Sequence, residues 1–199
     1  MRNVGIFVFT VFILLVSEVK GQSLHLGIKA GTNIAEVTGR PFDGGFQAGF
    51  SAGAFAELGI KGKWGLQPEI LYTQTKETTS TEFYYIAAPT PFNGIPGRSV
   101  TLSYINVPVL LSYKLLPVLS IQVGPSLGIL LNSSQNITYN FQNAFKSTDF
   151  LVVGGAQVNL AKVKLGARYS YGLSDISAVT PTDSWKNQNI QVYIGVRLF

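Results

Sequence analysis

The side chains that could carry out nucleophilic or acid–base chemistry are few in this chain of 199 residues. The chain has one histidine, His25, and no cysteine. A hydrolase or an acyltransferase needs a histidine beside a nucleophilic serine and an acidic residue, and no motif around His25 supplies these partners. The acidic residues never take the spacing of a metal-binding loop, and no phosphate-binding G-x-G-x-x-G or Walker pattern is present. We therefore expect no enzyme activity and no metal or other cofactor.

Charged residues recur instead at positions that alternate with apolar ones. They are Lys29, Glu57, Glu69, Arg168 and Arg197. Successive side chains of a strand point to opposite faces, so all five should share the polar face of a sheet. If that face lines an eight-stranded barrel, the interior is just wide enough to be filled by side chains. An unpaired charge there is strongly unfavourable, which favours a structural lumenal charge network, in one layer, over a narrow gated conduction path.

The elements that would hold these charges are long amphipathic strands. From Phe46 to Ile60 every second residue is apolar, and Phe55 is the one large hydrophobic residue between them. The same alternation runs from 190 to 198. This period is typical of a β-strand with one apolar face. The first run is longer than the about five or six residues of an ordinary strand, and it exceeds the roughly 9–11 residues that cross a bilayer.

Eight strand candidates alternate with short and long connections. The strands are expected at 23–34, 46–60, 64–76, 100–113, 118–131, 149–160, 162–173 and 189–199. The long connections are 35–45, 77–99, 132–148 and 174–188, and the short ones lie near 61–63, 114–117 and 161. Bacterial barrels have short periplasmic turns and long outer loops. The predicted fold is therefore all-β, an eight-stranded antiparallel up-and-down transmembrane β-barrel with both termini on the periplasmic side.

Prolines and aromatic residues bear on the details of this barrel. Pro68 and Pro125 lie inside strand candidates, where each removes a ladder hydrogen bond unless a bulge absorbs it. Outward Trp64 and Tyr113 lie near the short turns, where an interfacial girdle would place aromatic side chains. The alternative is that these are ordinary strand aromatics.

The first residues predict an exported protein. Arg2 precedes an uncharged apolar run from Val4 to Ser17, and Gly21 is a small residue at the cleavage-site spacing. The run is shorter than the about 20 residues of a transmembrane helix. We expect a signal peptide over residues 1–21 and an outer-membrane β-barrel domain over residues 22–199.

The connection 77–99 is the candidate segment for surface contacts with partners. Its aromatic residues Phe83, Tyr84, Tyr85 and Phe92 stand among prolines, and exposed aromatic side chains of long loops often make binding contacts. The alternative is that they cap the mouth of the barrel. The formal net charge is +5 and the basic residues are scattered. Because nucleic-acid binding needs a clustered basic patch, no nucleic-acid partner is expected.

Five stretches of the chain resemble the PorT-like outer-membrane β-barrel family, small outer-membrane proteins of the Bacteroidota type. They are residues 66–72, 104–111, 124–128, 166–173 and 195–199. The resemblance implies an eight-stranded outer-membrane barrel and little about activity. Phe199 resembles the terminal signal that the barrel insertion machinery reads, although it has the parity of Arg197 rather than that of the apolar face.

Together these patterns predict an integral protein of the cell outer membrane with a side-chain-filled lumen and a structural or loop-mediated interaction role. Its expected partners are outer-membrane lipid, the insertion machinery during assembly, and a protein partner at the surface loops. A small pore or a transport- or secretion-associated component is the functional alternative, and a lipid-modifying enzyme using His25 is a third class. A soluble lipocalin-like barrel is the alternative architecture, and it would reverse every face assigned above.

Overall fold

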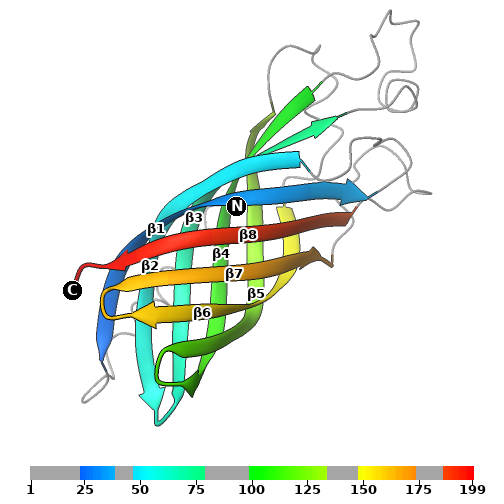
Figure 1. Cartoon of the computed structure of the whole chain (residues 1–199). Coiled ribbons are helices and arrows are strands. Elements are labelled where there is room, and N and C mark those ends of the chain that lie inside the picture. The colour runs from blue at the N-terminus through cyan, green and yellow to red at the C-terminus, as the bar shows by residue number, and fades with distance from the viewer. Residues whose placement is uncertain (1–22, 39–46, 79–98, 134–147, 174–185) are drawn as a thin grey trace, which may run out of the picture.

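The computed structural model describes residues 23–38, 47–78, 99–133, 148–173 and 186–199. These residues form one closed barrel of antiparallel strands (Figure 1), in which each strand pairs with the next and β1 also pairs with β8. The strands are β1 Leu24–Thr38, β2 Gln47–Lys61, β3 Trp64–Thr78, β4 Ser99–Leu116, β5 Leu119–Ser133, β6 Thr148–Leu160, β7 Val163–Gly172 and β8 Lys186–Arg197. The predicted fold class is confirmed.

The strands that close the barrel extend further than their apolar alternation. β1 was expected to end at 34 and β8 to begin at 189, yet the pairing continues through Ala35↔Asn189 to Thr38↔Lys186. Residues 186–189 are polar, so the apolar period fades there before the backbone hydrogen bonds do. The sequence pattern reports which residues meet an apolar environment, whereas the ladder continues as long as the two backbones lie side by side.

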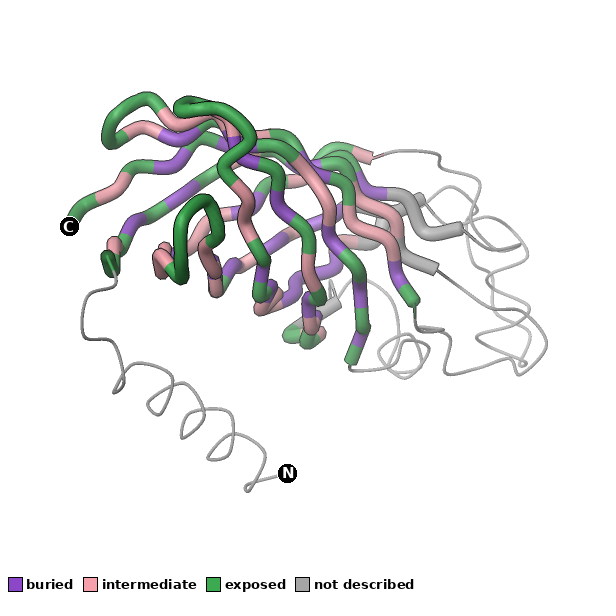
Figure 2. The backbone as a smooth tube through the Cα atoms, turned by 90° about the horizontal axis from the view of Figure 1, so that it is seen from below, coloured by how far each residue is buried: buried purple, intermediate pink, exposed green. Residues whose placement is uncertain are grey.

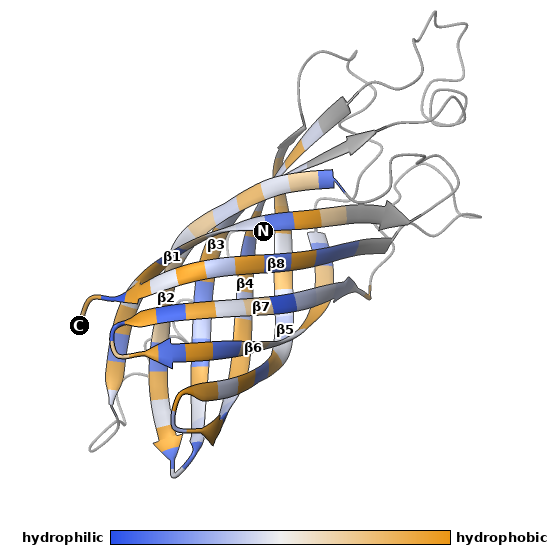
Figure 3. Cartoon of the chain, in the orientation of Figure 1, coloured by the Kyte–Doolittle hydropathy of each residue, from blue (hydrophilic) through white to orange (hydrophobic). Residues whose placement is uncertain are grey.

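The two faces of the barrel differ sharply in polarity. Along β8 the outward residues Val192 and Ile194 are exposed, whereas Gln191 and Tyr193, which alternate with them, are buried in the lumen. The same alternation of buried and exposed residues follows the other strands in Figure 2, and Figure 3 shows apolar and polar residues alternating along them. Apolar side chains outside and polar ones inside contradict the lipocalin-like alternative, which needs the opposite arrangement.

Prolines interrupt the ladder without shifting it. On β3, Pro68 is the partner of Val109, and the next pair along the strand, Leu71↔Asn106, has the same register. Pro125 likewise keeps its place opposite Val152. The register shifts occur elsewhere, between Gly59 and Lys61 on β2 and at two places on β4. No bulge is therefore needed at the prolines, because the flanking pairs hold the local register.

Three short turns lie at one end of the barrel, which we call the short-turn end. They join β2 to β3, β4 to β5 and β6 to β7. Gly62 and Ala161 have positive φ angles of 62° and 53°, as a tight reversal requires. Ser23 and Phe199 lie at the same end, since the carbonyl of Ser23 accepts a hydrogen bond from the amide of Gly59, and that of Phe199 accepts one from the amide of Leu26. In the part of the chain described, no helix is long and apolar enough to cross a membrane.

Candidate functional site

A buried carboxylate lies between two cations at the centre of the lumen. The Nζ atom of Lys29 on β1 is 3.0 Å from both carboxylate oxygens of Glu69 on β3. A terminal guanidinium nitrogen of Arg168 on β7 lies 2.9 Å from Oε2 of the same carboxylate. The Glu69 side chain is fully buried. These contacts join three strands that are not neighbours in the sheet, so they cross the lumen rather than follow its wall.

Tyr193 on β8 completes this central cluster of Lys29, Glu69, Arg168 and Tyr193. The Lys29 Nζ atom lies 3.6 Å from the centre of the Tyr193 ring, and the Arg168 Cζ atom lies 4.7 Å from it. Both distances suit a cation–π contact, which gains strength where water is excluded. The Tyr193 hydroxyl is also 3.0 Å from Oε1 of Gln157 and 3.2 Å from Oε1 of Gln122, to which it can donate.

Amide side chains link the central cluster across the rest of the lumen. Gln67 donates to Glu69 at 2.8 Å, and Gln122 donates to Gln67 at 2.8 Å. On the other side, Nε of Arg168 donates to Gln191 at 2.6 Å, and the amide of Gln191 contacts the Ser51 hydroxyl. Because each amide offers both donors and an acceptor, the cations and the carboxylate find partners among neighbouring side chains.

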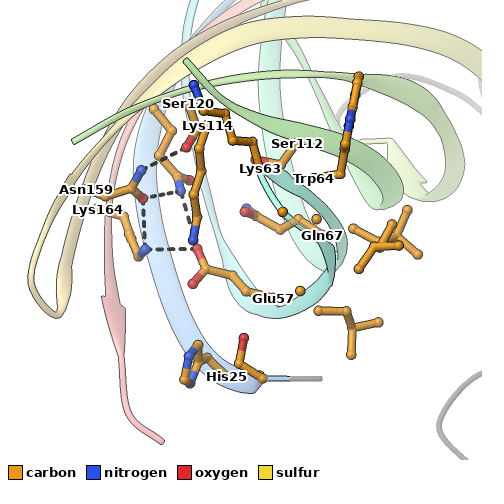
Figure 4. Close-up of a pocket in the computed structure, with 18 of the residues that line it drawn as sticks. His25, Glu57, Lys63, Trp64, Gln67, Ser112, Lys114, Ser120, Asn159 and Lys164 are labelled. Atoms are coloured by element: carbon orange, nitrogen blue, oxygen red, sulfur yellow. Dashed lines mark hydrogen bonds and ion pairs between the residues drawn. The ribbon is translucent and has the colours of Figure 1, made fainter. Parts of the chain in front are cut away.

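A second cluster lies closer to the short-turn end. Lys164 forms an ion pair with Glu57 at 3.0 Å and donates to Asn159 at 2.8 Å. Asn159 in turn donates to the Ser120 hydroxyl at 2.9 Å. Figure 4 shows these four side chains joined by hydrogen bonds and the ion pair. Gln157 donates to both Glu57 and Asn159, so it connects this short-turn cluster to the central cluster through Tyr193. We call the two connected clusters the lumenal network.

The lumenal network separates two cavities. A cavity of about 450 Å³, the short-turn cavity, is lined by residues such as His25, Glu57 and Lys114 and reaches inward to Gln67 and Gln157. A much smaller one of about 40 Å³ lies on the far side and is lined in part by Arg168 and Gln191. The side chains of the network therefore occupy the middle of the lumen.

The five predicted lumenal charges are distributed over two levels instead of one layer. Lys29, Glu69 and Arg168 come together, whereas Glu57 belongs to the short-turn cluster, and Arg197 lines the short-turn cavity. Strand register explains the split: Lys29 lies opposite Gly53, whereas Glu57 lies opposite His25, nearer the short turns. Among the described residues Arg197 makes no ion pair. The predicted loop contacts Phe83, Tyr84, Tyr85 and Phe92 lie outside the described residues.

The sequence did not single out several members of the lumenal network, among them Tyr193, Lys164 and Gln157. Each has the inward parity of its strand, which was the signal available, but parity does not tell which inward side chains meet. His25 lines the short-turn cavity, and no hydrogen bond joins it to a serine in the part of the chain described. Nor do the described residues contain a group of three or more His, Cys, Asp and Glu side chains that could hold a metal ion.

Comparisons with known proteins agree with this architecture. Residues 20–178 match the family described as "Outer membrane protein beta-barrel domain". The structure is similar to that of Neisserial surface protein A, with a TM-score of 0.51 and 15% identity over 90% of this chain and 100% of that chain. It is also similar to Ail, the attachment invasion locus protein of Yersinia pestis, with a TM-score of 0.50 and 16% identity over 88% of this chain and 99% of that one. At these identities the likeness concerns the fold alone. No curated protein matches the sequence.

Proposed function

Since this chain belongs to the outer membrane protein beta-barrel domain family, we propose that it is a closed outer-membrane anchor whose lumen is plugged and whose long connections make contacts at the cell surface. The observation that carries the proposal is the lumenal network. Its central carboxylate, that of Glu69, is paired with two cations and is wholly buried. A protein built to conduct would leave such charged groups along a water-filled path rather than lock them together.

The orientation that we propose puts the short turns, Ser23 and Phe199 in the periplasm, all of which lie at the same end of the barrel. Aromatic pairs support two membrane interfaces. The rings of Trp64 and Tyr113 lie 4.7 Å apart near the short turns, and those of Phe50 and Tyr72 lie 5.8 Å apart further along the strands. Tyrosine and tryptophan favour the headgroup region. Apolar side chains such as Ile194 occupy the outward face between these levels and would contact outer-membrane lipid.

Export and assembly complete the proposal. We assign residues 1–21 as a signal peptide and residues 22–199 as the barrel domain, which is delivered to the insertion machinery. The finer PorT-like resemblance is also part of the proposal, and it rests on the motifs between 66 and 199. No enzyme activity is proposed, because His25 has neither a serine nor a metal partner among the described residues.

Energetics favour a plug over a gate. Moving the central cluster aside would break charge-assisted hydrogen bonds, which are about twice as strong as neutral ones. It would also separate the Lys29 and Arg168 cations from the Tyr193 ring. An opening would have to offset all of these losses together, because the same side chains take part in each contact.

Single-channel recording tests the closed lumen. We expect the purified protein in a planar bilayer to give no sustained conductance steps. Sustained openings of the intact protein would overturn the plugged lumen and favour the alternative, a small pore for ions or solutes.

Surface contacts are tested separately. A photoreactive amino acid replacing Tyr84 should crosslink a protein partner in living cells, and the same group at the lipid-facing Ile194 serves as the control. Identical crosslinking patterns from both positions, or none from Tyr84, would remove the loop-mediated role. Either result would leave the barrel assignment unchanged.

A further inference from the structure

The short-turn cavity is lined by more cationic than anionic side chains, and the plugged lumen does not explain this excess. We propose that it binds a small solute carrying a multivalent oxyanion, with phosphate as the recognised group. This inference goes beyond the proposed anchor function, and it concerns the end of the barrel opposite the long connections.

Positive charge dominates the wall of this cavity. Five cationic side chains line it, against one carboxylate, that of Glu57. They are Lys61, Lys63, Lys114, Lys164 and Arg197. Figure 4 shows Lys63, Lys114 and Lys164 around the same space as Glu57.

The single carboxylate already has an ion-pair partner. Glu57 pairs with Lys164 at 3.0 Å, and among the described residues no other cation forms an ion pair with it. Lys63 also has a partner, since its Nζ atom lies 5.9 Å from the centre of the Tyr113 ring. Lys61, Lys114 and Arg197 therefore contribute positive charge that no described carboxylate balances. A cavity with cations on several strands and low-dielectric walls concentrates the field and draws in anions.

Backbone hydrogen bonds fix the strand positions from which two of these cations extend. The amide of Lys114 donates to the carbonyl of Lys63 at 2.9 Å, and the amide of Arg197 donates to the carbonyl of Lys162 at 2.8 Å. Lys114 is exposed and Arg197 is half-buried. The Arg197 guanidinium offers a planar fork suited to an oxyanion, and Lys114 offers a point charge that can turn toward it.

Neutral donors and the size of the cavity suit a small polar ligand. Ser112, Ser120 and Asn159 line the cavity together with the cations. Its volume of about 450 Å³ falls within the range of roughly 300–1,000 Å³ that small-molecule sites occupy. The lumenal network closes its inner side, so a ligand would enter from the short-turn end and stop there.

Two sources could supply the phosphate group. One is a soluble phosphorylated compound, and the other is the headgroup of a phospholipid that reaches over the rim. Both present the same oxyanion, and the experiment separates them.

Calorimetric titration of the purified protein in uncharged detergent with inorganic pyrophosphate tests the site. We expect saturable binding of one anion per barrel. A Lys114→Gln, Arg197→Gln double variant should weaken it by at least about tenfold, since each change removes a charge-assisted contact. Lys76→Gln is the control. It also removes a positive charge, but near the opposite end of β3, where Lys76 pairs with Thr101, so it should leave the affinity unchanged.

Glu57→Gln should change the affinity for pyrophosphate in the opposite direction. It removes the one carboxylate of the cavity and releases Lys164, so pyrophosphate should bind more tightly than in the unaltered protein. A misfolded variant could not produce that gain. Absence of saturable binding, or equal weakening by Lys76→Gln and by the double variant, would overturn the proposal.

Lipid nanodiscs distinguish the two sources. In discs of phosphatidylcholine alone pyrophosphate should bind as in detergent. Two results together would identify the recognised oxyanion as a headgroup. Added phosphatidylglycerol would abolish pyrophosphate binding in the unaltered protein, and the double variant would show no preference between the two lipids. Undiminished binding assigns a soluble phosphorylated compound.

Discussion

Gly166 and Tyr193 are register partners on β7 and β8, and the tyrosine ring occupies the space that a side chain at 166 would need. A Cβ atom at 166 would lie 2.3 Å from the ring and hydroxyl atoms of Tyr193. The missing side chain of Gly166 therefore lets Tyr193 lie across the lumen beneath Lys29 and Arg168. The absence of a side chain at 166 is therefore one condition for the central cluster to form.

Filling that space should destabilise the barrel. We expect Gly166→Ala to lower the free energy of unfolding by about 1–3 kcal/mol, the usual cost of overpacking, because the ring must leave both cations. Gly154→Ala is the matched control, since a Cβ atom at 154 meets nothing within 4 Å, and it should stabilise the barrel by about 0.5–1 kcal/mol because alanine has less freedom to lose on folding. Urea unfolding of the barrels in phospholipid vesicles measures both. Equal effects of the two changes would contradict the packing role of Gly166.

Removing the central carboxylate should be more harmful than removing the one near the short turns. Glu69→Gln leaves Lys29 and Arg168 buried without a counter-charge, for which we expect a loss of about 3–5 kcal/mol. The Glu57 side chain is 19% exposed, against 0% for Glu69, so water can solvate Lys164 after Glu57→Gln. The same unfolding assay should show a clearly smaller loss for Glu57→Gln, and the reverse order would refute a central role for Glu69.

The Tyr193 ring and its hydroxyl should have separable effects. Tyr193→Phe keeps the ring under the two cations but removes the donor to Gln122 and Gln157, so we expect a loss of about 1–3 kcal/mol and a lumen that stays closed. Tyr193→Ala removes the ring itself and should produce conductance steps in single-channel recording. A silent Tyr193→Ala variant would mean that the remaining network closes the lumen without this residue.

The β6–β7 turn contains a strained alanine. Ala161 has a φ of 53°, a left-handed conformation that is unfavourable for residues with a side chain. Ala161→Gly should therefore stabilise the barrel by up to about 1 kcal/mol. Ala156→Gly, in the middle of β6, should instead destabilise it by about 0.5–1 kcal/mol, because glycine there only adds freedom to the unfolded chain. Thermal unfolding of the two variants should show shifts of opposite sign.

The outward face should tolerate charge only near its ends. Ile194 is 52% exposed on the outside and pairs with Ala30 and Leu165 in mid-barrel. Ile194→Arg should cost about 2–4 kcal/mol in vesicles, and Leu160→Arg beside the β6–β7 turn only about 0–1 kcal/mol. Equal costs at the two depths would contradict a bilayer centred on Ile194.

Much of the architecture followed from local alternation. The run from Phe46 to Ile60 already indicated a long strand with one apolar face, and the spacing of turn-forming residues placed the remaining strands within a few residues of their observed bounds. The polar start of β8, residues 186–189, was missed because its side chains carry no apolar period. The same alternation showed that Lys29, Glu69 and Arg168 lie on the inward face of their strands.

What the sequence by itself determined is therefore the face on which each side chain lies, since side-chain direction in a strand is a local property with a period of two. Which inward side chains meet was decided by the closed barrel alone. Glu69 lies 40 residues from Lys29 and 99 from Arg168 in the chain, and strand stagger brings these three together while separating Glu57 from them. That stagger depends on how all eight backbones pair around the ring, and no stretch of sequence specifies it locally.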